Sequence, residues 1–465
     1  MELERARAEV IEAGKKLVER GLIARTWGNV SCRISSTRFV ITPSGKPYQS
    51  LMPQDIVPVR IEDGSYEGAV EPSSEAGVHA EIYRRRPGIN FIIHTHQPCA
   101  SVVSVLREDI DPGSIDSTAP GLLEGKVLSI PYALPGSSSL RLNVARALEF
   151  YESKAYLLTA HGALCLGKDS LETFKVAFCL EKICLKFIEK KYFELAPASL
   201  AGEKEKSAFA EIRKAFVLKQ AGELRQGEAW IGPDQSSEPY HFDPLKYSKA
   251  ELEELDKPKH EFYNSIREGD KIKLYPEGTD GSPFPDDRGV NLLAHLEDKQ
   301  CSTIANATSG ELITDNLTGF YQSPFKLHRS IYSAYSNIKA VIHARSPNIL
   351  AVSKTGMSLK PMFDDFAQII GIEAAVVNEH DETKQFYAGI IPRLEDCSAV
   401  LIENSGAICC GTGKSDVEAA AMILDKNCKA YMIASLLGKA EPISFEECNL
   451  MRKNYIKSYS KKMKC

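Results

Sequence analysis

The chain has 465 residues, 43% of them hydrophobic and 26% charged, and carries a formal net charge of −5. This length and apolar content favour a globular protein of two domains, and the scattered basic residues exclude the charged face of a nucleic-acid-binding protein. No stretch approaches the roughly 18 apolar residues of a membrane span, so a membrane partner is not expected either.

The first 21 residues are charged throughout and lack the apolar core of a secretory signal peptide. The 12 cysteines are dispersed and form no CxxC pair, which indicates reduced and mostly buried thiols rather than a disulfide framework. We therefore expect a cytoplasmic protein.

Helix and strand patterns alternate along the first part of the chain. Apolar residues at helical spacing predict a helix over residues 2–20, which ends at Gly21. Residues 72–88 predict a helix that Ser73 or Ser74 can cap, and residues 170–195 a long amphipathic helix. Short strands are predicted within residues 38–45, 55–61, 89–96, 126–136 and 155–167. This order is typical of the α/β or α+β class.

The pattern returns after a charge-rich stretch at residues 203–259, which we interpret as a linker. The stretch "FKLHRSIYSAYSNIKAVIHARSPNILAVS" repeats "EAGVHAEIYRRRPGINFIIHTHQPCASVVS", and "SAVLIENSGAICCG" repeats "KAYLLTAHGALCLG". An offset of 249 residues relates His79 to His328, Tyr83 to Tyr332 and His94 to His343. A repeat of this length indicates a duplicated domain.

Four side chains in the first copy are of the types that bind divalent metals. His94 and His96 lie two residues apart on a predicted strand, so they point to the same side. His161 ends another apolar strand, and Glu75 lies in the first turn of a predicted helix. Three imidazoles and one carboxylate form a zinc-like set, and a carboxylate that leaves the metal would open a position for substrate. Ordinary core or exposed histidines are the alternative.

Three short stretches have the features of an anion site. "TWGNVS" places Gly28-Asn29 in a turn, and "TPSGKPY" places Ser44-Gly45 in another. "EPSSE" places Ser73-Ser74 at a helix N-terminus, where free N–H groups and the helix dipole favour phosphate. Each stretch alone is typical of an ordinary turn or cap, but their occurrence beside the metal-type residues favours a phosphate site.

These motifs resemble the class II aldolase/adducin family, of the L-fuculose-1-phosphate aldolase type. The similarity covers roughly residues 1–196 through "GNVS", "ITPSG.PY", "PSSE...H...Y", the His-Thr-His stretch, "PYALPGSSSL" and "AHGAL". It implies an α/β fold made of two tandem α/β/α sandwich domains, each around a mostly antiparallel central sheet. The expected division is a metal-dependent catalytic domain at 1–200, a charged linker or elaborated connection at 201–260, and a degenerate, non-catalytic copy at 261–465.

The resemblance also implies roles for the candidate residues. The ligands of Zn²⁺, or of Mn²⁺, Fe²⁺ or Co²⁺, would be His94, His96 and His161, and Glu75 would be the acid/base that also caps the metal. The phosphate of a phosphorylated sugar would lie against Gly28, Asn29, Ser44, Gly45, Ser73 and Ser74. A zinc-stabilised enediolate would allow retro-aldol cleavage of a ketose 1-phosphate to dihydroxyacetone phosphate and an aldehyde.

Departures from the family pattern leave other activities open. The loop "DIDPGSIDSTAPGLLEGK" lacks the tyrosine that donates a proton in the typical aldolase, so Asp116 is either an acid in its place or an ordinary loop carboxylate. Trp27 stands where relatives more often have a small residue. Family epimerases have aspartate in place of Glu75, whereas decarboxylases and dehydratases keep the glutamate. A non-catalytic scaffold of the adducin-head type is the remaining alternative, and the retention of all four metal-type residues argues against it.

The second copy lacks most of these residues. Arg345 replaces the second histidine of the pair, Ser405 replaces the third ligand and Pro324 replaces the glutamate, so we expect no zinc there. The family usually forms tetramers with active sites between neighbours, which implies a homo-oligomer in which two chains make a ring of four domains. The second copy could still line the active site, with "ENSG" or Arg345 either as a binding feature or as ordinary surface residues.

Overall fold

The computed structural model describes residues 2–20, 22–23, 27–116, 120–194, 207–208, 263–268, 271–276, 303–306, 312–315, 322–378, 389–437 and 440–459. The chain divides into two compact units. The first comprises Met1–Glu189, Met362–Gln368 and Lys439–Cys465, and the second comprises Lys190–Pro361 and Ile369–Gly438. The predicted linker at 201–260 lies outside the described residues except for 207–208. The predicted boundaries at 200 and 260 stay predictions.

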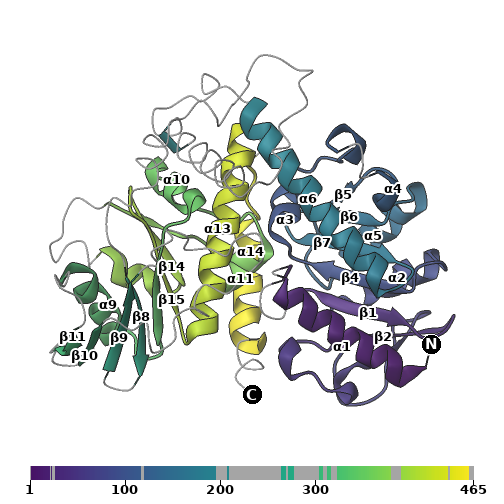
Figure 1. Cartoon of the computed structure of the whole chain (residues 1–465), viewed down its shortest axis with the longest axis horizontal. Coiled ribbons are helices and arrows are strands. Elements are labelled where there is room, and N and C mark those ends of the chain that lie inside the picture. The colour runs from purple at the N-terminus through teal and green to yellow at the C-terminus, as the bar shows by residue number, and fades with distance from the viewer. Residues whose placement is uncertain are drawn as a thin grey trace, which may run out of the picture. The chain divides into compact units, whose positions relative to one another are not determined.

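The first unit is built on a seven-stranded sheet (Figure 1). Its strands are β1 Asn29–Arg33, β2 Arg38–Ile41, β3 Val57–Arg60, β4 Phe91–Thr95, β5 Leu128–Ile130, β6 Ala155–Leu158 and β7 Gly162–Gly167. They lie in the order β3-β2-β1-β4-β7-β6-β5, and every neighbouring pair is antiparallel except β5 and β6. The predicted mostly antiparallel sheet is therefore confirmed.

Helices cover both faces of this sheet. The helices of this unit are α1 Leu3–Glu19, α2 Ala76–Arg85, α3 Pro98–Ser104, α4 Pro120–Leu123, α5 Ser138–Phe150, α6 Ser170–Glu194, α11 Asp364–Ile369 and α14 Phe445–Asn454. Successive strand residues point to opposite faces, so Ser31 of β1 faces α2 while Cys32 faces α1. On the α2 face, apolar residues of α2 and α5 pack against Ile92 and Leu164 in one buried core.

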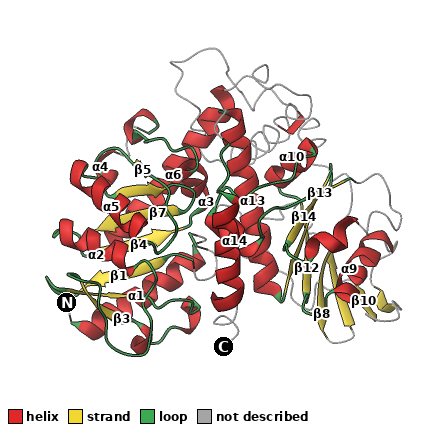
Figure 2. Cartoon of the chain, turned by 180° about the vertical axis from the view of Figure 1, so that it is seen from behind, coloured by secondary structure: helices red, strands yellow, loops and turns green. Residues whose placement is uncertain are grey.

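The second unit repeats this arrangement around an eight-stranded sheet (Figure 2). Its strands are β8 Tyr263–Glu268, β9 Lys271–Pro276, β10 Thr303–Asn306, β11 Leu312–Asp315, β12 Ala340–Ala344, β13 Val376–Val377, β14 Ala399–Ile402 and β15 Gly406–Gly411. Its main helices are α9 Gln322–Ala334, α10 Pro347–Thr355 and α13 Lys414–Leu436. β12 lies between β8 and β15 as β4 lies between β1 and β7, and β13 and β14 form the parallel pair. The predicted tandem α/β/α domains are confirmed.

A buried Ser-His-Tyr cluster recurs in both units. In the first unit, the Ser31 hydroxyl lies 2.6 Å from His79 Nδ1 and 2.8 Å from the Tyr83 hydroxyl. In the second unit, the corresponding distances from the Ser265 hydroxyl are 2.8 Å to His328 and 2.9 Å to Tyr332. The cluster therefore has the same role in both units. It joins α2 to β1 in the first unit and α9 to β8 in the second.

Two local features differ from the sequence prediction. We expected Gly28-Asn29 in a turn, but Asn29 is the first residue of strand β1. The N-cap of α2 is Glu75 rather than either serine, and the Ser73 hydroxyl accepts a hydrogen bond from the backbone N–H of Glu75 at 3.3 Å. This hydrogen bond in the turn before α2 therefore helps to fix the backbone position of Glu75.

The described part of the chain contains no helix whose length and apolar composition would let it cross a membrane. The 10 cysteines in these residues are free thiols. Most are buried, and burial raises the pKa of the Cys32 thiol to about 12. The described thiols agree with the prediction of structural rather than disulfide-forming cysteines.

Candidate metal centre

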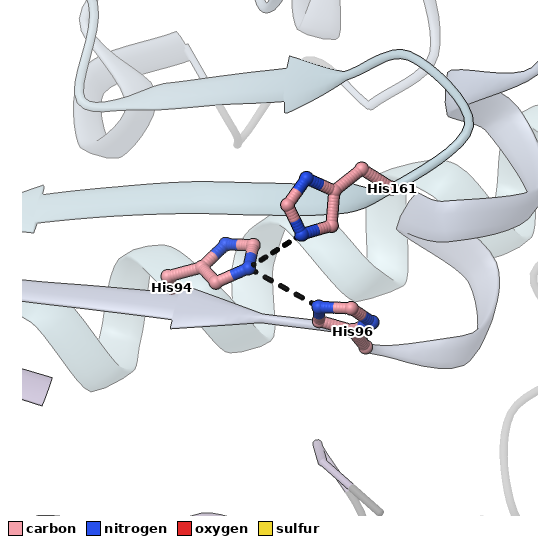
Figure 3. A group of neighbouring side chains, drawn as sticks. All are labelled: His94, His96 and His161. Atoms are coloured by element: carbon pink, nitrogen blue, oxygen red, sulfur yellow. Dashed lines mark hydrogen bonds between the residues drawn. The ribbon is translucent and has the colours of Figure 1, made fainter. Parts of the chain in front are cut away.

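Three histidines meet at one end of β4 (Figure 3). His94 is in β4, His96 follows directly after the strand, and His161 lies in the turn between β6 and β7. The Nε2 atom of His94 lies 3.2 Å from the Nε2 atoms of both His96 and His161, and all three side chains are buried. The structure thus brings together the three residues that the sequence predicted as a ligand set.

The hydrogen bond of His94 and the spacing of the imidazoles suit a divalent metal. Nδ1 of His94 donates to the carbonyl oxygen of Ala163 at 3.0 Å, which leaves a lone pair on Nε2. A tetrahedral ion with bonds of about 2.0–2.1 Å holds its donor atoms about 3.3–3.4 Å apart. The observed Nε2–Nε2 distances of 3.2 Å are close to this spacing. The three residues therefore fit a divalent metal ion.

Glu75 brings a carboxylate to the same point. Its Oε2 accepts a hydrogen bond from the Asn29 amide at 2.9 Å and lies 3.2 Å from His94 Nε2, while Oε1 lies 3.5 Å from His161 Nε2. Burial by itself raises the pKa of Glu75, but His94, His161 and the Asn29 amide together lower it to about 2. Burial lowers the pKa of His161 well below its ordinary value. Metal binding requires an ionised carboxylate, which the lowered pKa of Glu75 favours.

Two further carboxylates lie at this cluster, and the sequence analysis missed both. Oδ2 of Asp364 lies 3.5 Å from His161 Nε2, and Oδ2 of Asp365 lies 3.5 Å from His96 Nδ1. Both aspartates are buried, and ligand atoms of His96, Asp364 and Asp365 lie within 4.8 Å of one another. The one available signal was the repeat, because the offset of 249 relates Asp365 to the loop residue Asp116.

Gly28 and Asn29 lie at the start of β1, directly beside β4. Gly28 has a φ of 96°, and a Cβ atom there would lie 2.5 Å from the carbonyl oxygen of His94, so the position requires glycine. Asn29 pairs with His94 in the sheet, and its side-chain amide holds Glu75. Asn29 therefore positions the carboxylate, a role that the sequence did not predict.

The other predicted anion-binding residues lie in two adjoining segments. A bridge between Pro43 and Pro72 joins them, and the N–H of Ser73 donates to the Thr42 carbonyl at 3.0 Å. Ser74 is exposed at the start of α2. The structure thus brings Ser44, Gly45, Ser73 and Ser74 together; that they hold a phosphate stays a prediction.

Two residues singled out in the sequence have clear surroundings. The Asp116 carboxylate pairs with the ammonium groups of Lys186 at 2.7 Å and Lys182 at 3.6 Å. The Trp27 ring stacks beside His96 with 6.5 Å between ring centroids. Asp116 is therefore held by α6, and Trp27 forms one side of the histidine cluster.

Three of the four corresponding positions in the second unit carry different side chains, and the fourth keeps its histidine. His343 lies in β12, Arg345 just beyond its end, Ser405 in the turn between β14 and β15, and Pro324 in α9. His343 is buried, and burial lowers its pKa well below the ordinary value. That this copy binds no metal stays a prediction.

Similarity to known proteins extends over both units. The family model described as Class II Aldolase and Adducin N-terminal domain matches residues 8–187 and 300–432. A 5-deoxy-D-ribulose 1-phosphate aldolase of Bacillus thuringiensis is 31% identical over 186 residues, which are 39% of this chain and 85% of the relative. A 3-oxo-tetronate 4-phosphate decarboxylase of Haemophilus influenzae is 31% identical over 167 residues, 35% and 77% of the two chains. The solved L-fuculose-1-phosphate aldolase of Thermus thermophilus is 29% identical, with 41% of this chain and 96% of that chain covered and a TM-score of 0.36.

Proposed function

Because the chain belongs to the class II aldolase and adducin family and is an aldolase-type lyase, we propose that it performs metal-dependent retro-aldol cleavage of a ketose 1-phosphate. The products are dihydroxyacetone phosphate and an aldehyde. The observation that supports this most strongly is the convergence of three Nε2 atoms and the Glu75 carboxylate on one buried point. Two aldolase relatives are named for 5-deoxyribulose 1-phosphate and 5-methylthioribulose 1-phosphate. We therefore propose substrates of this kind as candidates in addition to L-fuculose 1-phosphate.

We assign Zn²⁺ as the metal, with Mn²⁺, Fe²⁺ and Co²⁺ as the other candidates, because three imidazoles at near-tetrahedral spacing suit zinc. A bound divalent ion supplies Lewis-acid stabilisation of the negative charge that cleavage generates on the substrate oxygens. The protein's contribution is to hold His94, His96 and His161 at fixed spacing, with the Ala163 carbonyl fixing the tautomer of His94.

Glu75 is the proposed acid/base. Its carboxylate lies within 3.2 Å of His94 Nε2 and is held by Asn29 rather than by its own helix, so it can move when substrate arrives. It transfers a proton to or from the carbon that is left when the C–C bond breaks. The substrate phosphate is assigned to Gly28 and Asn29 at the start of β1, Ser44 and Gly45 after β2, and Ser73 and Ser74 before α2.

The test is to incubate the zinc-loaded protein with a panel of ketose 1-phosphates and to measure dihydroxyacetone phosphate by a coupled reduction. We expect release with at least one member of the panel, and a loss of about 10²–10⁴-fold in Glu75→Gln, which keeps the metal but lacks the acid/base. A zinc-loaded protein that cleaves no member, or a Glu75→Gln variant of unchanged activity, would contradict the proposal.

A decarboxylase is the second candidate, because two of the relatives are named 3-oxo-tetronate 4-phosphate decarboxylases and are 30–31% identical to this chain. Loss of carbon dioxide leaves negative charge on the same atoms as retro-aldol cleavage, so the same residues can serve both reactions. Carbon dioxide released from a 3-oxo-tetronate 4-phosphate, without dihydroxyacetone phosphate from ketoses, would favour it.

We also propose that the chain acts as a cytoplasmic homo-oligomer. Two chains supply four family domains, the number in a tetramer of single-domain subunits. Light scattering of the active protein tests this, and a fully active monomer would exclude it.

A further inference from the structure

The buried pair Asp364 and Asp365 belongs by sequence to the second family match but by packing to the first unit. The backbone N–H of Asp364 donates to the carbonyl of Ala160 at 3.2 Å, directly before His161. The rings of Phe363 and Phe366 on either side are fully buried. This segment is therefore anchored against the turn that carries the third histidine.

The two carboxylates face different histidines of the cluster. Oδ2 of Asp364 lies 3.5 Å from His161 Nε2, the atom that also faces His94, so this carboxylate is on the inner side together with Glu75. Oδ2 of Asp365 lies 3.5 Å from Nδ1 of His96, whose Nε2 faces His94. Asp365 therefore stands behind the imidazole, where a carboxylate orients a metal-bound histidine.

Three carboxylates are buried at this cluster. Glu75, Asp364 and Asp365 are each less than one-tenth exposed. Burying carboxylates close together costs several kcal/mol per charge unless an ion of opposite sign offsets them. Asp364 lies within salt-bridge distance of His161, and Asp365 within salt-bridge distance of His96.

The loop that carries Asp364 and Asp365 has a counterpart in the first copy, where the corresponding carboxylate has a different partner. Ile110 and Leu359, which are 249 residues apart, each form an isolated antiparallel bridge at the start of this loop. At the same offset Asp116 corresponds to Asp365, but Asp116 pairs with Lys186. The second copy has thus kept the loop while its carboxylate faces an imidazole instead of an ammonium group.

We propose that the second copy completes the metal centre of the first, with Asp364 as an additional oxygen donor and Asp365 as the outer partner that orients His96. This inference rests on the proposed metal-dependent function. It gives the second copy a defined chemical role and makes the centre a site of three nitrogen donors and two carboxylates. Such a set also accommodates Mn²⁺, Fe²⁺ and Co²⁺, which accept more than four donors.

The test compares Asp364→Asn and Asp365→Asn with the matched control Asp425→Asn. Asp425 is also a buried aspartate, but its carboxylate accepts hydrogen bonds from Ser346 and Asn348 in the second unit. Metal-free full-length proteins are titrated with Zn²⁺ against a chromophoric chelator. We expect the affinity of Asp365→Asn to fall about 10–100-fold and that of Asp364→Asn at least about tenfold, with the control unchanged.

The visible spectrum of bound Co²⁺ separates the two roles. Because Asp364→Asn removes a donor atom, its band intensity and position change, whereas Asp365→Asn keeps the donor set and the wild-type bands. Thermal unfolding of the metal-free proteins provides the check on folding. We expect Asp364→Asn to be at least as stable as wild type without metal, because one buried charge is gone, and to gain less stability from Zn²⁺.

Wild-type affinity and wild-type Co²⁺ spectra in both variants would overturn the inference even if the enzyme cleaves ketose 1-phosphates. Conversely, a wild-type protein that binds zinc through these aspartates but cleaves no sugar phosphate would leave the inference standing and remove the proposed function.

Discussion

Gly162 sets the distance between two of the candidate metal ligands, so adding a single methyl group there tests the geometry of the centre. The residue follows His161 directly and begins β7, which pairs with β4. A Cβ atom at Gly162 would lie 2.2 Å from the carbonyl oxygen of Thr95 and 3.2 Å from Cε1 of His94. Ordinary contacts begin at 3.4 Å, so in Gly162→Ala the two strands have to separate by about 1.2 Å at this point.

This separation falls between His161 on one side and His94 and His96 on the other. A misplacement of about 1 Å in a preorganised site costs about 100-fold in rate, and we expect a comparable loss of zinc affinity and activity in Gly162→Ala. Overpacking also costs about 1–3 kcal/mol of folding stability. Affinity is measured by chelator competition, activity by the coupled assay and stability by chemical denaturation.

Gly406 offers a matched control. It occupies the corresponding turn of the second unit, where a Cβ atom would lie 2.4 Å from the carbonyl oxygen of Ala344. Its φ of 108° makes alanine at least as strained as at Gly162. Gly406→Ala should therefore lose similar stability but keep its zinc affinity. Wild-type affinity in Gly162→Ala, or an equal loss in Gly406→Ala, would refute the reasoning.

Three further predictions follow from the same region. Zinc titration should change tryptophan fluorescence, and Trp27→Phe should abolish the change, because the Trp27 ring stacks beside His96. Burial lowers the pKa of His79 to about 3, below the value near 6.5 of the unfolded chain, so acid favours the unfolded state. This histidine alone should therefore lower the free energy of unfolding by about 2 kcal/mol between pH 7 and pH 5, which denaturant titrations at the two pH values can measure. Asn29→Ala removes a donor that stabilises ionised Glu75, so the acidic limb of the activity profile should move to higher pH.

The sequence predicted those features that local pattern determines. The apolar run before His94 predicts a strand, and the two-residue spacing brings His94 and His96 together. β1 was missed because Gly28-Asn29 is typical of a turn, whereas here the backbone is held between β2 and β4. Only long-range pairing decides such a case.

Asp364 and Asp365 could not be placed from the sequence for a different reason. Neither is close in sequence to the histidines, and an Asp-Asp pair at the start of a short helix is typical of an exposed helix end. Their burial depends on the docking of residues 362–368 in the first unit, which contacts far along the chain determine. The repeat offset relates Asp365 to Asp116, but it does not predict that the Asp365 carboxylate lies beside His96.

The Ser-His-Tyr clusters explain why the two copies differ in their ligands but not in their cores. Each cluster joins a helix to the sheet through buried polar groups, and removing one member would leave its partners unpaired, at about 1–3 kcal/mol for each group. This cost does not depend on whether the unit binds a metal. Arg345 and Ser405 lie just beyond the end of β12 and in a turn, where a change of side chain leaves the core intact. The second copy can therefore lose its ligands and keep its fold, and its loop is then free to contribute Asp364 to the site of the first.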